Sequence, residues 1–132
     1  MWHDINRKVF SKVVDLFDYS LKGHNTFGID AVCRRFVEFE TVGELQQTVS
    51  SLTAADRPLL VIGGGSNLLF TGDYKGTVLH SAIKGCEARI ENDGVYLRCG
   101  SGETWDDVVN LCVEQGWYGA ENLSLIPGEV GA

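Results

Sequence analysis

An α+β fold is the class that this sequence predicts, and three observations support it. Residues 32 to 62 hold two strand-like segments on either side of a helix-like one, the order of a β-α-β unit. Residues 88 to 99 hold two alternating segments around Asp93-Gly94, which is typical of a β-hairpin. A helix-like segment that stops at Gly116 follows the hairpin. With 132 residues and 44% hydrophobic content, the chain is long enough for a compact domain with a core.

The first expected element is an amphipathic helix for which Asp4 is the N-cap. Apolar residues recur every four positions along its face: Ile5, Val9, Val13 and Phe17. Gly23 closes this region. We expect this helix to serve packing alone.

The middle of the chain predicts a half-exposed strand over residues 32 to 40, followed by a helix. Thr41 and Glu44 have the spacing of a capping box, with Thr41 as the N-cap. The helix is expected to bury four apolar residues: Val42, Leu45, Val49 and Leu52. A short apolar strand over Leu59–Ile62, buried on both faces, and another strand over residues 77 to 80 complete this part.

After residue 84 the pattern changes, which predicts a second part of the fold. Residues 1–84 would form a first α/β subdomain with its N-terminal helix, and residues 85–132 the beginning of a second α+β subdomain. The helix of the second part is expected to start near Ser101 or Gly102 and to bury Trp105, Val108, Val109 and Cys112. A hairpin and one helix leave an apolar face uncovered, so this second part is expected to be incomplete.

The most informative motif is the glycine-rich segment that follows Leu59–Ile62. Three glycines, Gly63 to Gly65, precede Ser66 and Asn67, and such a turn can aim successive backbone N–H groups at one anion. Leu68 occupies the third glycine position of a dinucleotide fingerprint, and the lysine of a P-loop is missing. Two interpretations stay open at this point: a phosphate cradle, or a tight turn packed under a neighbouring element.

A second glycine-containing turn lies near the end of the chain. Pro127 and Gly128 fit the central positions of a type II turn, because Gly128 accepts a positive φ. Backbone N–H groups here and at Ser124 are candidates for contact with a second part of the same ligand. Taken alone, the same residues are also typical of an ordinary surface turn.

Charge and cysteine spacing exclude several classes of partner. The net charge of -7 argues against a nucleic-acid partner, because such proteins neutralise phosphates with clustered lysine and arginine. No C-x-x-C pair occurs among the four cysteines, so neither a zinc site nor a thioredoxin-like motif is predicted: Cys33, Cys86, Cys99 and Cys112. No secretory signal and no membrane-spanning run is recognisable, so a cytoplasmic protein without a membrane partner is expected.

Three motifs occur in the order and at the separations found in one family: residues 25–30, residues 63–69 and residues 121–132. With them, the chain resembles the UDP-N-acetylenolpyruvoylglucosamine reductases, flavoproteins of peptidoglycan precursor synthesis. The resemblance implies an FAD-binding domain of the vanillyl-alcohol oxidase or p-cresol methylhydroxylase type. It implies FAD contacts from two groups of residues: Gly63, Gly64, Gly65, Ser66 and Asn67 at the diphosphate, and Ser124, Ile126, Pro127, Gly128 and Gly131 at the flavin and diphosphate.

The same resemblance implies an activity for the longer family members. NADPH reduces the flavin, which passes hydride to UDP-N-acetylglucosamine enolpyruvate and so yields UDP-N-acetylmuramate. The family's catalytic residues and substrate-binding domain lie beyond the last of the three motifs, so no catalytic residue is expected within this chain. We therefore expect the isolated chain to be inactive and its FAD affinity to be low.

The first motif and the histidine before it are not assigned to FAD contact as the glycines are. Asn25 to Asp30 are as well explained by a structural turn as by FAD contact, and His24 is expected to be a surface residue. Two alternative functions remain. One is an FAD-linked oxidase of the same fold, in which histidine or cysteine often holds the flavin covalently. The other is a non-catalytic nucleotide-binding module with purely structural glycine turns.

Overall fold

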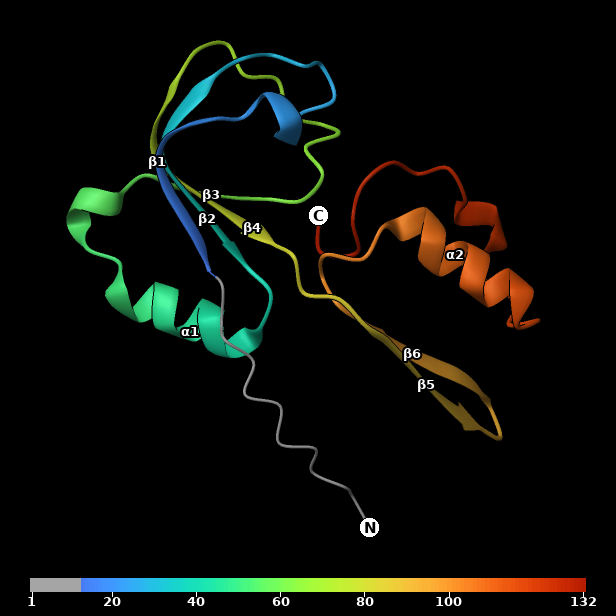
Figure 1. The fold of residues 1–132 in the computed structure, drawn as a ribbon. Helices are drawn as coiled ribbons and strands as arrows, with labels where there is room; N and C mark the ends of the chain where they lie inside the picture. Colours follow the sequence, from blue (N-terminus) through green and yellow to red (C-terminus); the bar gives the residue numbers. More distant parts are fainter. Residues whose placement is uncertain (1–12) are drawn as a thin grey trace.

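The structure is a computed structural model, and it describes residues 13–132. Its larger sheet contains four strands in the order β1-β2-β4-β3 (Figure 1). The bounds of these strands are β1 Val14–Ser20, β2 Val32–Phe39, β3 Leu59–Ile62 and β4 Tyr74–Ser81. β1 is antiparallel to β2, whereas β2 and β3 both run parallel to β4. The predicted β-α-β unit is therefore present, with β4 inserted between its two strands.

The helix of that unit is α1, Val42–Ser51, and its predicted capping box is confirmed. The Glu44 N–H donates to Thr41 Oγ1 at 3.1 Å, and the Thr41 N–H donates to Glu44 Oε2 at 3.0 Å. The predicted buried face is only partly correct: Leu45 packs against the core, but Val42 and Val49 are more than half exposed, and Glu44 and Thr48 are buried instead. Glu44 Oε2 also accepts the Glu40 N–H, so the capping box turns the Glu44 side of the helix toward the sheet.

Apolar side chains pack on both faces of the four-stranded sheet. On one face, Phe36 and Val78 are covered by residues of the loops that follow β1 and β3, including Leu21 and Leu68. The other face carries Val37, Phe39 and Leu79, against which Leu45 of α1 and Ile83 pack. The two central strands, β2 and β4, therefore hold the core, and the loop after β3 lies over one face of it.

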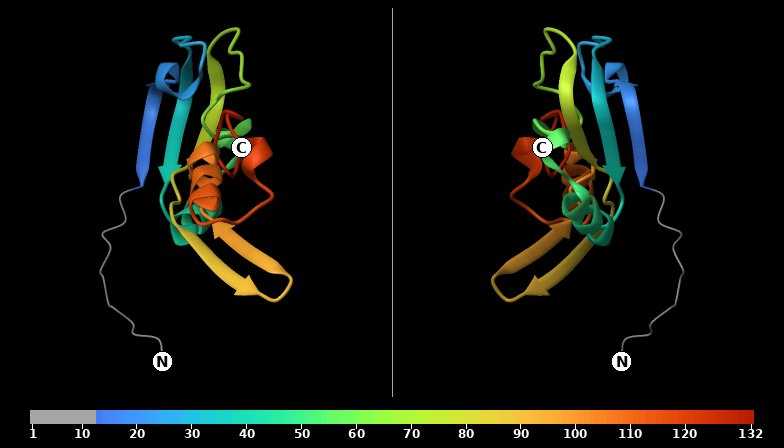
Figure 2. Two further views of the ribbon diagram at one scale, coloured as in Figure 1. Left: turned by 90° about the vertical axis from the view of Figure 1, so that its right-hand side faces the viewer. Right: turned by 90° about the vertical axis from the view of Figure 1, so that its left-hand side faces the viewer.

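The second part of the molecule contains a hairpin and one helix. β5 Cys86–Glu91 and β6 Gly94–Cys99 form the predicted hairpin, which projects away from the larger sheet in Figure 2. α2, Trp105–Glu114, buries Val108, Val109 and Cys112 as predicted, whereas Trp105, which was also expected to be buried, is only partly buried. Its N-cap is Thr104 rather than Ser101 or Gly102, because the segment before it is held by hydrogen bonds to other loops.

An apolar groove of about 580 Å³ lies between the hairpin and α2. Leu97 of β6, Trp105 and Val108 of α2, and Trp117 and Val130 are among the residues that line it. The expectation that a hairpin and one helix leave an apolar face uncovered agrees with this groove. The division of the chain at residue 84 into two FAD-binding subdomains stays a prediction.

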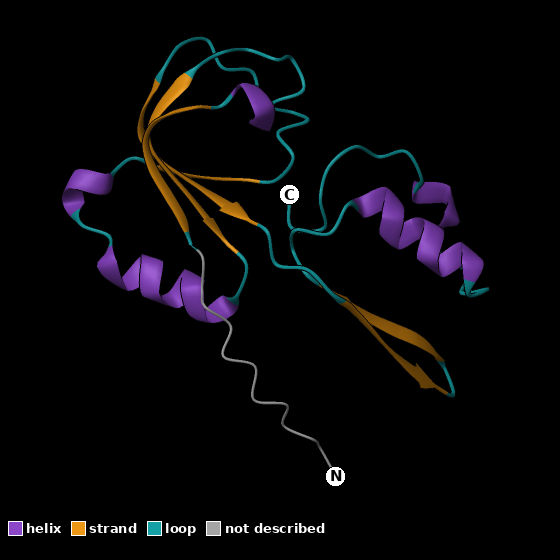
Figure 3. Cartoon of the chain, viewed as in Figure 1, coloured by secondary structure: helices purple, strands orange, loops and turns teal. Residues whose placement is uncertain are grey.

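The chain passes between the two parts through loop segments (Figure 3), and short contacts hold these segments together. The Gly102 N–H donates to the Ile83 carbonyl at 2.9 Å, and the Ser81 and Ser101 hydroxyl oxygens lie 2.6 Å apart. A methyl group on Gly102 would come within 2.5 Å of the Ser81 carbonyl oxygen. The chain can therefore cross between the parts at this point because residue 102 has no side chain.

The predicted N-terminal helix is wrong where it can be compared. Residues 4 to 12 of that prediction lie outside the described residues, and Val14–Ser20 form β1 instead. β1 pairs with β2 from Val14 opposite Glu38 to Ser20 opposite Val32. Phe17, expected on a buried helix face, is 67% exposed and lies under the Arg35 guanidinium.

β3 also differs from its prediction, because it is the outer strand of the sheet. Ile62 is buried as expected, but Val61 is 67% exposed. The apolar composition of Leu59–Ile62 predicted a strand buried on both faces, and that is correct for one face only.

Among the described residues, no helix is long and apolar enough to cross a bilayer.

Candidate functional site

The glycine-rich segment over residues 63–67 and the turn around Pro127 and Gly128, called the first and second glycine loops, meet in the structure. The residues that join them, Ser66 and Pro127, are 61 residues apart in sequence. Ser66 Oγ donates to the Pro127 carbonyl at 3.3 Å. A Cβ on Gly64 would lie 3.8 Å from the Gly128 Cα, and one on Gly63 would come within 2.5 Å of the Ala132 side chain. The loop after β3 and the segment ending at residue 132 therefore form one continuous backbone surface, as the sequence predicted.

Backbone N–H groups on this surface are free to bind a ligand. In residues 13–132, no hydrogen bond is donated by the N–H groups of Gly64 to Asn67, nor by those of Ile126 and Gly128. Gly128 has a φ of 125°, the positive value its prediction required, and the chain bends there. Successive unpaired N–H groups in a glycine-rich turn are the usual donors to a phosphate.

The glycines differ in what they are needed for. At Gly65, with φ of 68°, a Cβ would lie 1.9 Å from the His24 carbonyl oxygen, so its absence is required by packing. Gly131 is similar, because its N–H donates to the Ser101 carbonyl and a Cβ would meet the Ser101 side chain at 2.5 Å. Gly64 has neither constraint. Internal packing therefore does not require a glycine at position 64, and contact of this residue with a ligand stays a prediction.

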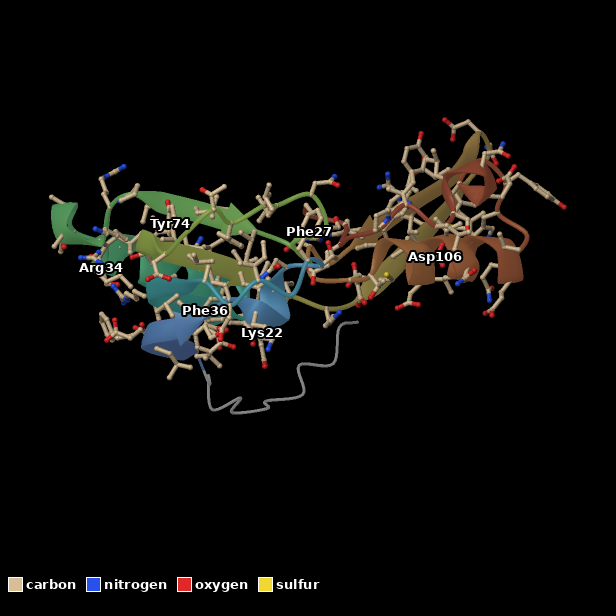
Figure 4. All side chains as sticks on the ribbon, turned by 90° about the horizontal axis from the view of Figure 1, so that it is seen from above. Lys22, Phe27, Arg34, Phe36, Tyr74 and Asp106 are labelled. Carbon is tan, nitrogen blue, oxygen red and sulfur yellow. The ribbon has the colours of Figure 1, made fainter. Side chains whose placement is uncertain are left out.

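The turn over residues 25–30 packs against the first glycine loop and holds it by hydrogen bonds. The buried Asn25 side chain donates to the Leu21 and Ile29 carbonyls and accepts the Ile29 N–H. Thr26 Oγ1 then donates to the Ser66 carbonyl at 3.3 Å. Of the two interpretations offered for this turn, the structural one accounts for these contacts. Phe27, at its tip, is 64% exposed and lies at the border between the two parts in Figure 4.

The second glycine loop is held by the first turn of α2. Asp106 Oδ1 accepts the Ser124 hydroxyl at 2.9 Å and the Leu125 N–H at 2.7 Å. The backbone bond from Leu125 and then the Ser124 hydroxyl lower the pKa of Asp106. The Ser124 hydroxyl is therefore engaged in an intramolecular hydrogen bond, whereas the Ile126 side chain is 48% exposed.

A histidine links the larger sheet to the second glycine loop. His80 Nδ1 lies 2.8 Å from Glu38 Oε2, and His80 Nε2 lies 3.3 Å from Glu129 Oε1. Glu129 Oε2 is buried without a hydrogen-bond partner among the described residues, and it would lie 3.4 Å from a Cβ on Gly63. This oxygen can accept an N–H or hydroxyl group from a bound molecule.

His24 belongs to the same cluster, and its prediction as a surface residue is wrong. Its ring is half-buried, with its centroid 4.6 Å from that of Phe36 and 5.2 Å from that of His80. Burial, and then the neighbouring His80, lower the pKa of His24. This cluster was not predicted. No local sequence signal indicates it, because parallel strand pairing is what places Glu38 opposite His80.

Comparison with known proteins decides the family. Residues 33–132 match the family described as FAD binding domain. The chain belongs to the FAD binding domain family. This result and the folded arrangement confirm the predicted α+β FAD-binding fold, and they identify FAD as the cofactor. The glycine surface fits such a cofactor, since the N–H groups of Gly64 to Asn67 donate no hydrogen bond within residues 13–132 and the nearest atom to a Cβ on Gly64 lies 3.8 Å away.

Individual relatives of this FAD binding domain carry one name. The UDP-N-acetylenolpyruvoylglucosamine reductase of Bacteroides fragilis (strain YCH46) is 56% identical over 115 residues, which are 86% of this chain and 34% of the relative. The enzyme of the same name from Shewanella sp. (strain MR-4) is 45% identical over 116 residues, 88% of this chain and 34% of the relative. The chain therefore spans about a third of the length of these curated relatives.

A solved structure agrees with this FAD binding domain over most of its length. The crystal structure of UDP-N-acetylenolpyruvylglucosamine reductase (MurB) from Thermus caldophilus matches with a TM-score of 0.63 and 26% identity. The match covers 92% of this chain and 41% of that chain. Which residues of this chain hold FAD stays a prediction.

Proposed function

We propose that this chain is the FAD-binding portion of an NADPH-dependent UDP-N-acetylenolpyruvoylglucosamine reductase. In this proposal the longer enzyme reduces UDP-N-acetylglucosamine enolpyruvate to UDP-N-acetylmuramate for peptidoglycan synthesis. Its partners are FAD, NADPH and the UDP-sugar, and its compartment is the cytoplasm, where these nucleotides are available. Support comes from the names of relatives that are 56% and 45% identical. Catalytic residues are not assigned to this chain.

The single observation that carries the FAD site is the contact between the two glycine loops. Gly64 to Asn67, Ile126 and Gly128 present N–H groups on adjoining backbone, and none of these groups donates a hydrogen bond within residues 13–132. Hydrogen bonds to an ionised group contribute about 1.5 to 3 kcal/mol each. We therefore assign the diphosphate to Gly63, Gly64, Gly65, Ser66 and Asn67, with Pro127 and Gly128 facing them.

The remaining predicted residues take supporting or flanking roles in the proposal. Ile126 is exposed beside the loop contact and offers apolar area to the flavin ring system. Ser124 and Gly131 act through the protein, because Ser124 anchors its loop on Asp106 and Gly131 packs on Ser101. When bound in the longer enzyme, FAD supplies the hydride acceptor and donor, while this chain's residues position it.

The first test is a titration of the wild-type chain and of Gly64→Ala with FAD, in which flavin fluorescence measures binding. Internal packing tolerates the substitution, since the nearest atom to the new Cβ is 3.8 Å away. We expect its stability to stay within about 0.5 kcal/mol of wild type and its FAD affinity to fall about tenfold or more, or about 1.4 kcal/mol. Gly72→Ala is the matched control, because no atom lies within 4 Å of its Cβ.

Two results would count against the site. A wild-type chain that binds neither FAD nor ADP is a module with purely structural turns. Equal FAD affinity in Gly64→Ala and wild type would remove the diphosphate from this loop. Acid precipitation of the FAD complex also tests the oxidase alternative, in which flavin would stay attached to the protein because a histidine or cysteine holds it.

The reductase itself is tested with a chimera. Residues 33–132 of this chain replace the matching segment of the Bacteroides fragilis relative, and NADPH oxidation is measured with and without UDP-N-acetylglucosamine enolpyruvate. We expect oxidation that depends on this substrate, reduced by Gly64→Ala and unchanged by Gly72→Ala. A chimera that retains FAD but consumes no NADPH with the substrate present would contradict the reductase assignment.

A further inference from the structure

Two cysteines face each other across the base of the hairpin. Cys86 begins β5, Cys99 ends β6, and the two are direct partners in the antiparallel register. Their Sγ atoms lie 3.0 Å apart, and both are free thiols. No step of the proposed FAD chemistry uses either residue. The pair therefore requires its own explanation.

The position of this pair in the ladder suits a covalent bond. Antiparallel partners alternate between hydrogen-bonded and non-hydrogen-bonded pairs, and Glu91 opposite Gly94 closes the two-residue turn. The pair that closes the turn is of the hydrogen-bonded kind, and Cys86 and Cys99 are the fifth pair beyond it. Because the two kinds alternate, Cys86 and Cys99 are a non-hydrogen-bonded pair. The Gly100 N–H bond to the Gly85 carbonyl at 2.7 Å, just outside the pair, confirms this assignment.

Non-hydrogen-bonded partners have the closer side chains, with Cα atoms about 4.5 Å apart. That spacing lies inside the range of about 4.4 to 6.8 Å found for disulfides. The backbone of this hairpin can therefore accept a bond between residues 86 and 99 without moving. Neither Cys33 nor Cys112 has a cysteine partner of this kind, and both are buried.

The two thiols of the pair differ in their accessibility. Cys86 is exposed, whereas Cys99 is partly buried. Burial, and then the thiol contact with Cys86, raise the pKa of Cys99 to about 12. A reagent in solution therefore meets Cys86 first, and Cys99 is positioned to react second.

We infer that Cys86 and Cys99 form a dithiol modification site, which a small-molecule disulfide such as oxidised glutathione converts into an intramolecular disulfide. Cys86 loses its proton to water, and its thiolate attacks one glutathione sulfur, which breaks the glutathione S–S bond and releases one glutathione. Deprotonated Cys99 then attacks Cys86 Sγ and releases the second glutathione. Two protein thiols are oxidised, and one glutathione disulfide is reduced to two thiols.

The resulting bond would fasten the base of the hairpin at the crossing between the two parts of the molecule. The Gly85 N–H donates to Glu103 Oε1 at 2.6 Å, and the Gly102 N–H donates to Ile83. The disulfide adds a covalent link next to these hydrogen bonds. Because the site is exposed, we expect dithiothreitol to reverse it.

The test uses the wild-type chain incubated with oxidised glutathione under native conditions. Remaining thiols are alkylated after unfolding, and tryptic peptides are analysed by mass spectrometry. We expect the peptide of residues 85–89 linked to that of residues 99–132, two hydrogens lighter than the sum, with Cys33 and Cys112 alkylated. Dithiothreitol before alkylation should abolish the link.

Two cysteine variants identify which residues form the link. Cys112→Ser should keep the link, which excludes Cys112 as the partner within the peptide of residues 99–132. Cys86→Ser should lose it and leave Cys99 alkylated or joined to glutathione. Separate glutathione or alkyl groups on Cys86 and Cys99 in the oxidised wild-type chain, or a link through Cys33 or Cys112, would overturn the inference.

Discussion

Three constraints meet at Gly65. Its carbonyl accepts the Thr26 N–H, its φ is 68°, and a Cβ there would lie 1.9 Å from the His24 carbonyl oxygen. We predict that Gly65→Ala lowers the free energy of unfolding by at least about 1 to 2 kcal/mol from the left-handed conformation alone. Urea unfolding measures this loss. A loss no larger than that of Gly72→Ala would contradict it.

His24 gives a second prediction at this scale. Burial disfavours its charged form and the neighbouring His80 adds to this, so its pKa should lie below the ordinary 6.5 in an NMR titration. The unfolded chain then binds more protons than the folded one near and below that pH, so stability falls as the pH drops through it. His80→Gln should raise the His24 pKa, and an unchanged value would refute the coupling.

Individual site residues were predictable to the extent that their chemistry is local. Gly64, Ser66 and Gly128 were expected on one ligand, and the structure brings them together. His80 and Glu129 were missed, because their meeting depends on strand register and on the path of the final loop. Neither is visible in a stretch of sequence.

Among the elements, the short helix η2, Ala54–Asp56, is joined to the sheet by one arginine. The Arg35 guanidinium contacts Asp15 of β1 and Asp56 at 2.8 Å each. The Thr53 N–H first, and then Arg35, lower the pKa of Asp56 to about 2. This depressed value means that ionised Asp56 favours the folded state above its ordinary pKa, and that the contribution disappears as the pH falls toward 2.

We predict that Asp56→Asn lowers stability at neutral pH and flattens its decline in acid. Urea unfolding of both proteins across the acid range measures the difference, which should shrink as the pH falls. Asp18→Asn is the control, since Asp18 is exposed and forms no ion pair among the described residues. Equal acid dependence in wild type and Asp56→Asn would refute the assignment.

Element types followed from the sequence where local signals agreed with tertiary contacts. Thr41 and Glu44 fixed the start of α1, and Gly116, with φ of 69°, fixed the end of α2. β1 was predicted as a helix, because Val13 and Phe17 are four residues apart and pairing with β2 cannot be read locally. Pairing across the sheet overrode that spacing.

For the whole molecule, we predict two levels of protection against hydrogen exchange. β2 and β4 are central strands with buried residues, whereas every residue of β5 is exposed. Backbone groups in β2 and β4 should therefore exchange slowest, and those of β5 and β6 much faster, because local opening of the hairpin exposes little apolar surface. Mass spectrometry of exchanged peptides measures this. Equal protection of both sheets would show a single cooperative unit instead.

The contact between Ser66 and Pro127 affects the balance between the folded and unfolded states of the molecule. It closes 61 residues of chain, so the paired loops exist only once both parts have folded. Any compound held there recognises the native ensemble and not the unfolded one. By mass action, a flavin that binds at this contact would raise the melting temperature as its concentration rises.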